Sequence, residues 1–117
     1  MPALIALLLV LHVVPGVYWA GSTFVLAQAR GAGADRLFRS QMIAATVAVL
    51  AGIVLWGLLH AGPNGPVERT LGIGAVCAVV AAGVQGGMRK SPATSQRIAA
   101  ALLAITVICM VVAKYTV

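Results

Sequence analysis

Four long apolar stretches dominate this sequence of 117 residues. They cover residues 2–27, 41–59, 70–87 and 98–117. Each approaches the roughly 20 residues that an α-helix needs to cross the hydrocarbon core of a bilayer. In lipid such a run has to be helical, because its backbone polar groups find no water and must bond within the segment. The pattern therefore predicts an all-α, integral membrane four-helix bundle, with residues 1–117 forming a single transmembrane domain.

The composition leads to the same prediction. Hydrophobic residues make up 62% of the chain and charged residues only 9%, whereas a soluble domain carries about a quarter charged residues. A domain of this size has too much surface to hide so many apolar side chains in one core. The lipid bilayer is therefore the expected partner. The first run is also too long for a signal peptide and has no lysine or arginine before Arg30, so we do not expect its cleavage.

The net charge of +6 comes from cations that lie mainly between the apolar runs. Residues 28–40 and 88–97 hold six of the eight lysines and arginines, namely Arg30, Arg36, Arg39, Arg89, Lys90 and Arg97. Short basic loops face the cytoplasm of a membrane protein, which predicts an N-out/C-out topology with both of these loops inside. We expect a bacterial inner membrane as the location. Because the cations are few and lie in two short loops between apolar runs, they do not indicate nucleic-acid binding.

Small residues repeat every four positions in three of the runs. The repeats are Gly16 with Ala20, Ala44 with Ala48 and Gly52, and Gly83 with Gly87. This spacing lets helix backbones approach each other closely inside a membrane. The repeats therefore predict helix contacts, either within the chain, between copies in a homo-oligomer, or against a larger membrane complex.

His12 is an ionisable residue inside the first apolar run, about 13 Å along a helix from its start. Ionisable groups are costly at this depth and often mark functional sites. Gly16 and Trp19 follow at i+4 and i+7, which places them on the same helix face. A neutral imidazole can bind haem iron, copper or zinc, or relay a proton. His12, Gly16 and Trp19 are thus the candidate cofactor-binding residues, and the alternative is a histidine that only hydrogen-bonds a neighbouring helix.

Cys77 and Cys109 lie in the third and fourth runs, at depths of about 10–12 Å that match His12. One imidazole and two thiolates, with Met110 nearby, would suit Cu(I), so the three residues are a candidate metal site. The alternative is that both cysteines are small apolar core residues. Depth alone does not say where their side chains point. The sequence contains no phosphate-binding glycine loop, catalytic triad or zinc-type cysteine spacing, so it identifies no reaction.

The pattern His12-x6-Trp19-x-Gly21, followed by an arginine-rich loop with Leu37-Phe38-Arg39 and Met42, is similar to a known arrangement. It resembles the helical membrane superfamily of the CopD copper-resistance proteins and the small haem-binding HemJ-type protoporphyrinogen oxidases. The resemblance covers most of the chain. It implies a four-helix core in which His12 is a haem b ligand or a copper contact.

Two further positions resemble the superfamily and two differ from the oxidases within it. Gly52 in the second run and the Val-Val-Ala-Lys sequence ending at Lys114 are similar. In the third run, Glu68-Arg69-Thr70 stands where the oxidases have a lysine, and Gln85 where they have a later histidine. The resemblance therefore does not extend to oxidase activity.

Three functional hypotheses remain open at this point. The first is a small membrane protein that binds haem b or a metal through His12 and takes part in electron transfer or redox chemistry. The second is an accessory or assembly subunit that packs against a larger membrane complex. The third is Cu(I) handling by His12, Cys77 and Cys109.

Overall fold

The computed structural model describes residues 2–60, 62 and 65–115. Four α-helices follow one another: α1 (Pro2–Gln28), α2 (Ala34–Leu59), α3 (Pro66–Gly87) and α4 (Pro92–Val112), with a short 3-10 helix, η1 (Ala113–Tyr115), after them. No strand occurs among these residues. All four helices are long enough and apolar enough to cross a membrane. The described residues are thus all-helical, as the apolar runs predict, and the length and composition of the four helices suit a multi-pass membrane protein.

Three of the four helices begin earlier than their apolar runs. α2 starts at residue 34 instead of 41, α3 at residue 66 instead of 70, and α4 at residue 92 instead of 98. The apolar run marks the part of a helix that lies in hydrocarbon, whereas the helix itself continues into the polar interface. In α3 and α4 the first turn begins at a proline, whose fixed φ suits that position. The fourth helix was predicted to reach residue 117, but α4 ends at Val112 and residues 116–117 lie outside the described range.

α1 ends in a Schellman motif, a helix end in which one residue adopts a left-handed conformation. Here that residue is Arg30, with a φ of 55°. The Arg30 N–H donates to Ala27 O at 3.2 Å and the Gly31 N–H donates to Leu26 O at 2.8 Å, so two terminal carbonyls are satisfied. The loop predicted over residues 28–40 is therefore a short turn, and Arg36 and Arg39 belong to α2.

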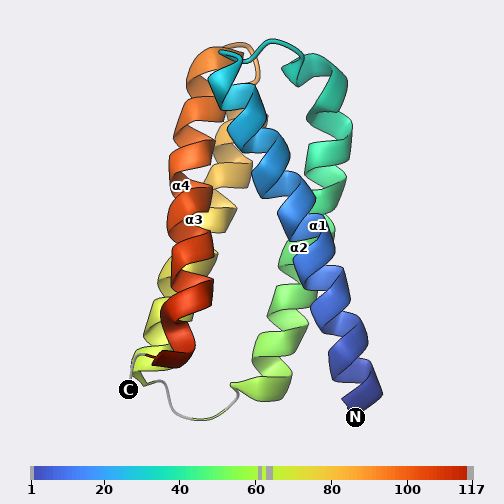
Figure 1. Ribbon diagram of the computed structural model, residues 1–117, viewed down its shortest axis with the longest axis vertical. Coiled ribbons are helices and arrows are strands. Elements are labelled where there is room, and N and C mark those ends of the chain that lie inside the picture. Colours follow the sequence, from blue (N-terminus) through green and yellow to red (C-terminus); the bar gives the residue numbers. More distant parts are fainter. Residues whose placement is uncertain (1, 61, 63–64, 116–117) are drawn as a thin grey trace.

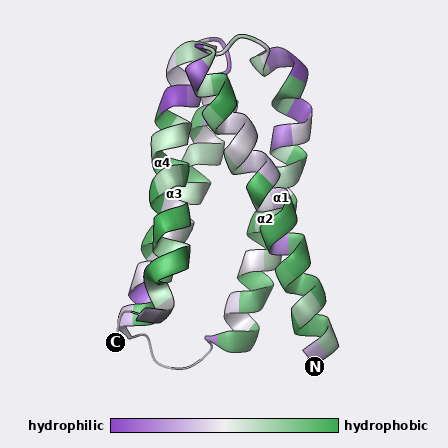
Figure 2. Cartoon of the chain, viewed as in Figure 1, coloured by the Kyte–Doolittle hydropathy of each residue, from purple (hydrophilic) through white to green (hydrophobic). Residues whose placement is uncertain are grey.

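The helices form two antiparallel hairpins, α1–α2 and α3–α4, and α1 also packs on α4 (Figure 1). The hairpins meet at the end that carries the α1–α2 and α3–α4 turns and separate toward the other end (Figure 1). The burial pattern agrees with this picture. α1 has no buried residue before Trp19, and α4 has none after Leu103. Hydrophilic residues gather at the end with the two turns, and the helix surfaces beyond it are mostly hydrophobic (Figure 2).

Small side chains fill most of the core. Its cluster contains Trp19, Ala20, Ala44, Ala45, Ala78, Ala81, Ala99 and Leu103. Large apolar side chains such as Val17, Ile53 and Val76 are more than half exposed on the outside, which suits contact with lipid. Ala44 and Ala48 are buried, as the small-residue repeat in α2 predicts. Gly83 and Gly87 instead have nothing within 4 Å of their Cβ positions among the described residues, so this repeat makes no close helix contact within the chain, and a contact with another chain stays a prediction.

Candidate functional site around His12 and the buried polar network

The His12 imidazole lies against the backbone of α2. His12 is partly buried, and its Nδ1 is 2.7 Å from the carbonyl oxygen of Ala48. A carbonyl oxygen can only accept a hydrogen bond, so Nδ1 carries the proton and donates it. In the neutral ring this tautomer leaves a lone pair on Nε2. The contact therefore fixes the imidazole in the form that can bind a metal through Nε2.

Gly52 provides the space that the ring occupies. A Cβ atom added at Gly52 would be 2.8 Å from Cε1 and 3.0 Å from Nδ1 of His12. Gly52 lies one helical turn after Ala48, so a side chain there would stand over the carbonyl group that accepts from His12. One turn further along α1, a Cβ at Gly16 would lie 4.0 Å from Ala48 Cβ. Ala48 and Gly52, which belong to the predicted small-residue repeat of α2, thus form a notch that holds the imidazole.

Substitution of Gly52 tests this arrangement. We expect Gly52→Ala to push the imidazole out of the notch and to break its bond to Ala48, which lowers the free energy of unfolding by about 1–3 kcal/mol. Gly57→Ala is the matched control, because Gly57 also lies in α2 and has nothing within 4 Å of its Cβ position among the described residues. The control should be neutral or slightly stabilising. Unfolding of both variants in mixed detergent micelles provides the comparison, and equal stability would contradict the notch.

Trp19 does not take part in the His12 contact. Its indole is 3% exposed, and Nε1–H donates to Oε1 of Gln85 at 2.7 Å. Nε2 of Gln85 in turn donates to Thr23 Oγ1 at 2.9 Å and to Gln96 Oε1 at 3.1 Å. A single glutamine of α3 therefore joins α1 and α4. Of the predicted cofactor-binding residues, His12 and Gly16 lie together at the α1–α2 contact, whereas Trp19 belongs to a polar network.

Gln41 brings α2 into the same network. Its Nε2 donates to Ser22 Oγ and to Thr23 Oγ1, both at 3.2 Å, and Thr23 Oγ1 donates to the carbonyl of Trp19 at 2.7 Å. Oε1 of Gln41 is buried and has no hydrogen-bond partner within the described part of the chain. The network thus contains amide or hydroxyl groups from all four helices, near the end where the hairpins meet.

The ionisable residues of the apolar runs do not predict this network, because its amide and hydroxyl groups carry no charge. The sequence pattern marks Gln85 only as a replacement for a histidine and places residue 96 in a loop. The available signal was the amide groups themselves, since a buried polar group without a partner is costly in a membrane and glutamines within apolar runs therefore tend to bond to one another.

The two cysteines lie on the α3–α4 hairpin and both are partly buried free thiols. A Cβ added at Gly74 would be 3.0 Å from Cys109 Cβ, so α3 and α4 approach closely here. Thr106 strengthens this contact by donating its hydroxyl to the Gly74 carbonyl at 2.9 Å. Among the described residues, no three histidine, cysteine or acidic side chains come close enough to hold a metal ion. The structure therefore does not bring Cys77 and Cys109 together with His12, and the copper site remains a prediction.

His60, the other histidine, has a structural partner at the opposite end of the bundle. Its Nδ1 is 2.7 Å from Oε2 of Glu68, and this contact ties the end of α2 to the start of α3. Glu68 also accepts from the backbone N–H of Gly65 through Oε1 at 2.9 Å. Trp56 packs beside His60, with ring centroids 5.9 Å apart. These contacts account for His60 without a cofactor.

No protein-family model, curated protein or solved structure matches this chain. The resemblance to the CopD and HemJ-type proteins consequently remains a prediction from sequence patterns.

Proposed function

We propose that the protein is a small haem b-binding membrane protein in which Nε2 of His12 would hold the iron. The observation that carries the proposal is the 2.7 Å hydrogen bond from Nδ1 of His12 to the Ala48 carbonyl. Histidines that bind metals nearly always donate their other ring N–H to a carbonyl or carboxylate, which orients the ring and makes the ligating nitrogen more basic. His12 has this arrangement within an apolar helix.

The donor set favours haem over a bare metal ion. The porphyrin already supplies four nitrogen ligands, so one protein imidazole is enough to hold the iron. A bare copper or zinc ion needs several protein ligands at once, and no group of three candidate ligands occurs among the described residues. When bound, haem supplies one-electron chemistry. In this proposal His12 binds the iron, Ala48 orients the imidazole and Gly52 leaves room for it.

We further infer an N-out/C-out orientation in a bacterial inner membrane. The turns at residues 29–33 and 88–91 lie at the same end of the bundle, near six of the eight cations of the chain. Cationic ends of membrane proteins face the cytoplasm. His12 precedes the half of α1 that reaches this end, so the proposal places the haem ligand in the outer half of the membrane.

An absorption spectrum and metal analysis of gently extracted full-length protein test the proposal. We expect a Soret band and iron in the wild-type protein, and loss of most of the bound haem in His12→Ala because the axial ligand is gone. Added imidazole should restore part of the band in this variant. His60→Ala is the matched control and should keep its haem, because His60 is engaged with Glu68.

Other outcomes would overturn the haem proposal in distinct ways. Copper that is lost in Cys77→Ser and Cys109→Ser would support the Cu(I) hypothesis instead. A colourless protein that co-purifies in fixed stoichiometry with a larger membrane complex would support the accessory-subunit hypothesis. A Soret band that persists in His12→Ala would assign the ligand to another residue.

A further inference from the structure

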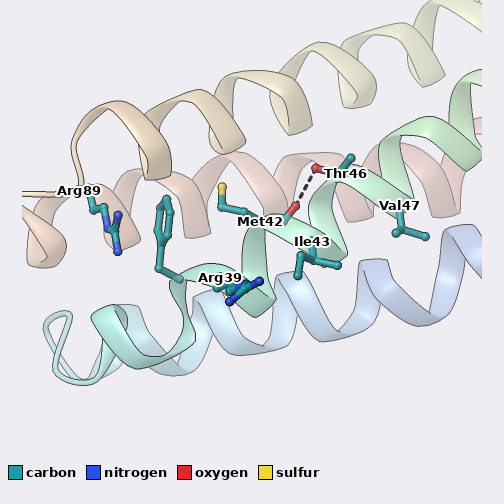
Figure 3. Close-up of a pocket in the computed structure, with 7 residues that line it drawn as sticks. Arg39, Met42, Ile43, Thr46, Val47 and Arg89 are labelled. Atoms are coloured by element: carbon teal, nitrogen blue, oxygen red, sulfur yellow. Dashed lines mark hydrogen bonds between the residues drawn. The ribbon is translucent and has the colours of Figure 1, made fainter.

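A groove runs along the surface of α2 near the end where the hairpins meet (Figure 3). It extends along α2 from Phe38 to Val47 and is bordered by Arg89, which follows α3. Its volume is about 530 Å³. Nine residues of helix separate Phe38 from Val47, so the groove follows the helix axis for roughly 14 Å. It is not part of the His12 site or of the buried polar network.

One end of the groove is apolar. Met42, Ile43 and Val47 contribute apolar side chains, and Thr46 donates its hydroxyl to the carbonyl of Met42 at 2.8 Å (Figure 3). Because this hydroxyl is already bonded within the helix, it does not require a polar partner in the groove. This part of the surface therefore suits a hydrocarbon chain.

The other end of the groove is cationic. Arg39 and Arg89 both line it, and the guanidinium carbon of Arg89 lies 3.9 Å from the centroid of the Phe38 ring. This cation–π contact holds the charge beside the Phe38 ring. Within the described residues, neither arginine has a carboxylate within ion-pair distance, although Asp35 lines an adjoining hollow together with Arg89 and Lys90. The groove is thus lined by two arginines and no acidic residue, and the adjoining hollow by two cations and one acidic residue.

We propose that this groove binds an anionic phospholipid, with the headgroup phosphate between Arg39 and Arg89 and an acyl chain along Met42 to Val47. Charge complementarity carries the proposal, because two unpaired guanidinium groups lie at the polar end of an apolar groove that is aligned with a membrane-spanning helix. Arginine forks match phosphate oxygens well, and basic pockets at the cytoplasmic side of membrane helices recognise anionic headgroups. The proposal does not depend on haem.

Native mass spectrometry of full-length protein, titrated with phosphatidylglycerol or phosphatidylcholine in detergent, tests the site. We expect wild-type protein to bind phosphatidylglycerol about tenfold or more tightly than phosphatidylcholine. The double variant Arg39→Gln/Arg89→Gln should lose this preference. The matched control, Arg36→Gln/Arg97→Gln, removes the same charge at positions that do not line the groove and should retain it. Equal loss in both double variants would overturn the site in favour of general surface charge.

A second pair of variants tests the acyl-chain part of the groove. Thr46→Phe fills it and should weaken binding of both lipids severalfold, whereas Ile53→Phe, at an exposed position of α2 outside the groove, should not. Inorganic phosphate should not displace phosphatidylglycerol. Displacement by phosphate would overturn the lipid proposal in favour of a free-anion site, and an unchanged Thr46→Phe variant would contradict the acyl-chain path. Retained lipid preference in His12→Ala would separate this site from the haem proposal.

Discussion

Gly31→Ala is expected to prevent most of the protein molecules from reaching the folded state. Gly31 is buried between the two hairpins, and a Cβ atom there would lie 2.6 Å from the backbone carbon of Pro92 and 2.7 Å from the backbone nitrogen of Ala93. Backbone atoms cannot move aside as a flexible side chain can. Gly31 also has a φ of +82°, which costs an alanine about 1–2 kcal/mol even without the clash. The total loss should exceed about 4 kcal/mol.

Gly33→Ala is the matched control for this prediction. Gly33 lies in the same turn with a φ of +90°, but the nearest atom to its Cβ position is Leu26 Cδ2 at 3.8 Å. This variant should bear only the conformational cost of an alanine at positive φ, without a clash, and should still fold. Size-exclusion chromatography and thermal unfolding in detergent measure the folded fraction. If both variants were equally stable, the α1–α2 turn would not touch the start of α4.

Gln85→Leu is expected to cause the second large loss of stability. Leucine retains the bulk of the side chain but leaves the indole N–H of Trp19 and the side-chain oxygen Oε1 of Gln96 without their buried partner. Each unpaired buried group costs about 1–3 kcal/mol. The unfolded chain in a membrane also finds polar partners, which lowers the difference. We therefore expect a decrease of about 2–4 kcal/mol in the free energy of unfolding.

The same substitution at an exposed glutamine, Gln28→Leu, is the control and should change stability by less than about 0.5 kcal/mol. Unfolding titrations in mixed micelles measure both variants. Trp19→Phe in the Gln85→Leu background should recover part of the loss, because it removes the unpaired donor. Equal effects of Gln85→Leu and Gln28→Leu would show that the network does not stabilise the bundle.

The number of helices and their apolar character could be predicted from the sequence because each membrane crossing needs one long apolar run. Helix starts could not, since α2 begins at Ala34 with polar turns that lie before the apolar run. Ala48 and Gly52 of the α2 repeat do contact α1, whereas the Cβ positions of Gly83 and Gly87 have no described residue within 4 Å. A small-residue repeat shows that a helix face permits close approach, but it does not show whether a neighbour lies there.

The candidate site was predictable only in part for a related reason. Helical spacing placed His12 and Gly16 on one face, and the structure brings both to Ala48. The acceptor for the imidazole is a backbone carbonyl, however, and every residue has one, so no sequence pattern identifies it. Cys77 and Cys109 match His12 in depth, but the direction of each side chain around its helix axis depends on packing. This direction decides whether the three side chains point toward one common site.

The two hairpins pack against each other at only one end of the bundle, and this affects how a molecule could reach the His12 site. The polar network and the Gly31 contact hold the turn end together, while α1 buries nothing before Trp19. Local opening in a protein follows the distribution of buried contacts. The stretch of α1 around His12 can consequently separate from its neighbours while the fastened end stays intact. A bulky molecule could enter or leave sideways from the lipid, at the cost of a partial opening and without unfolding the whole chain.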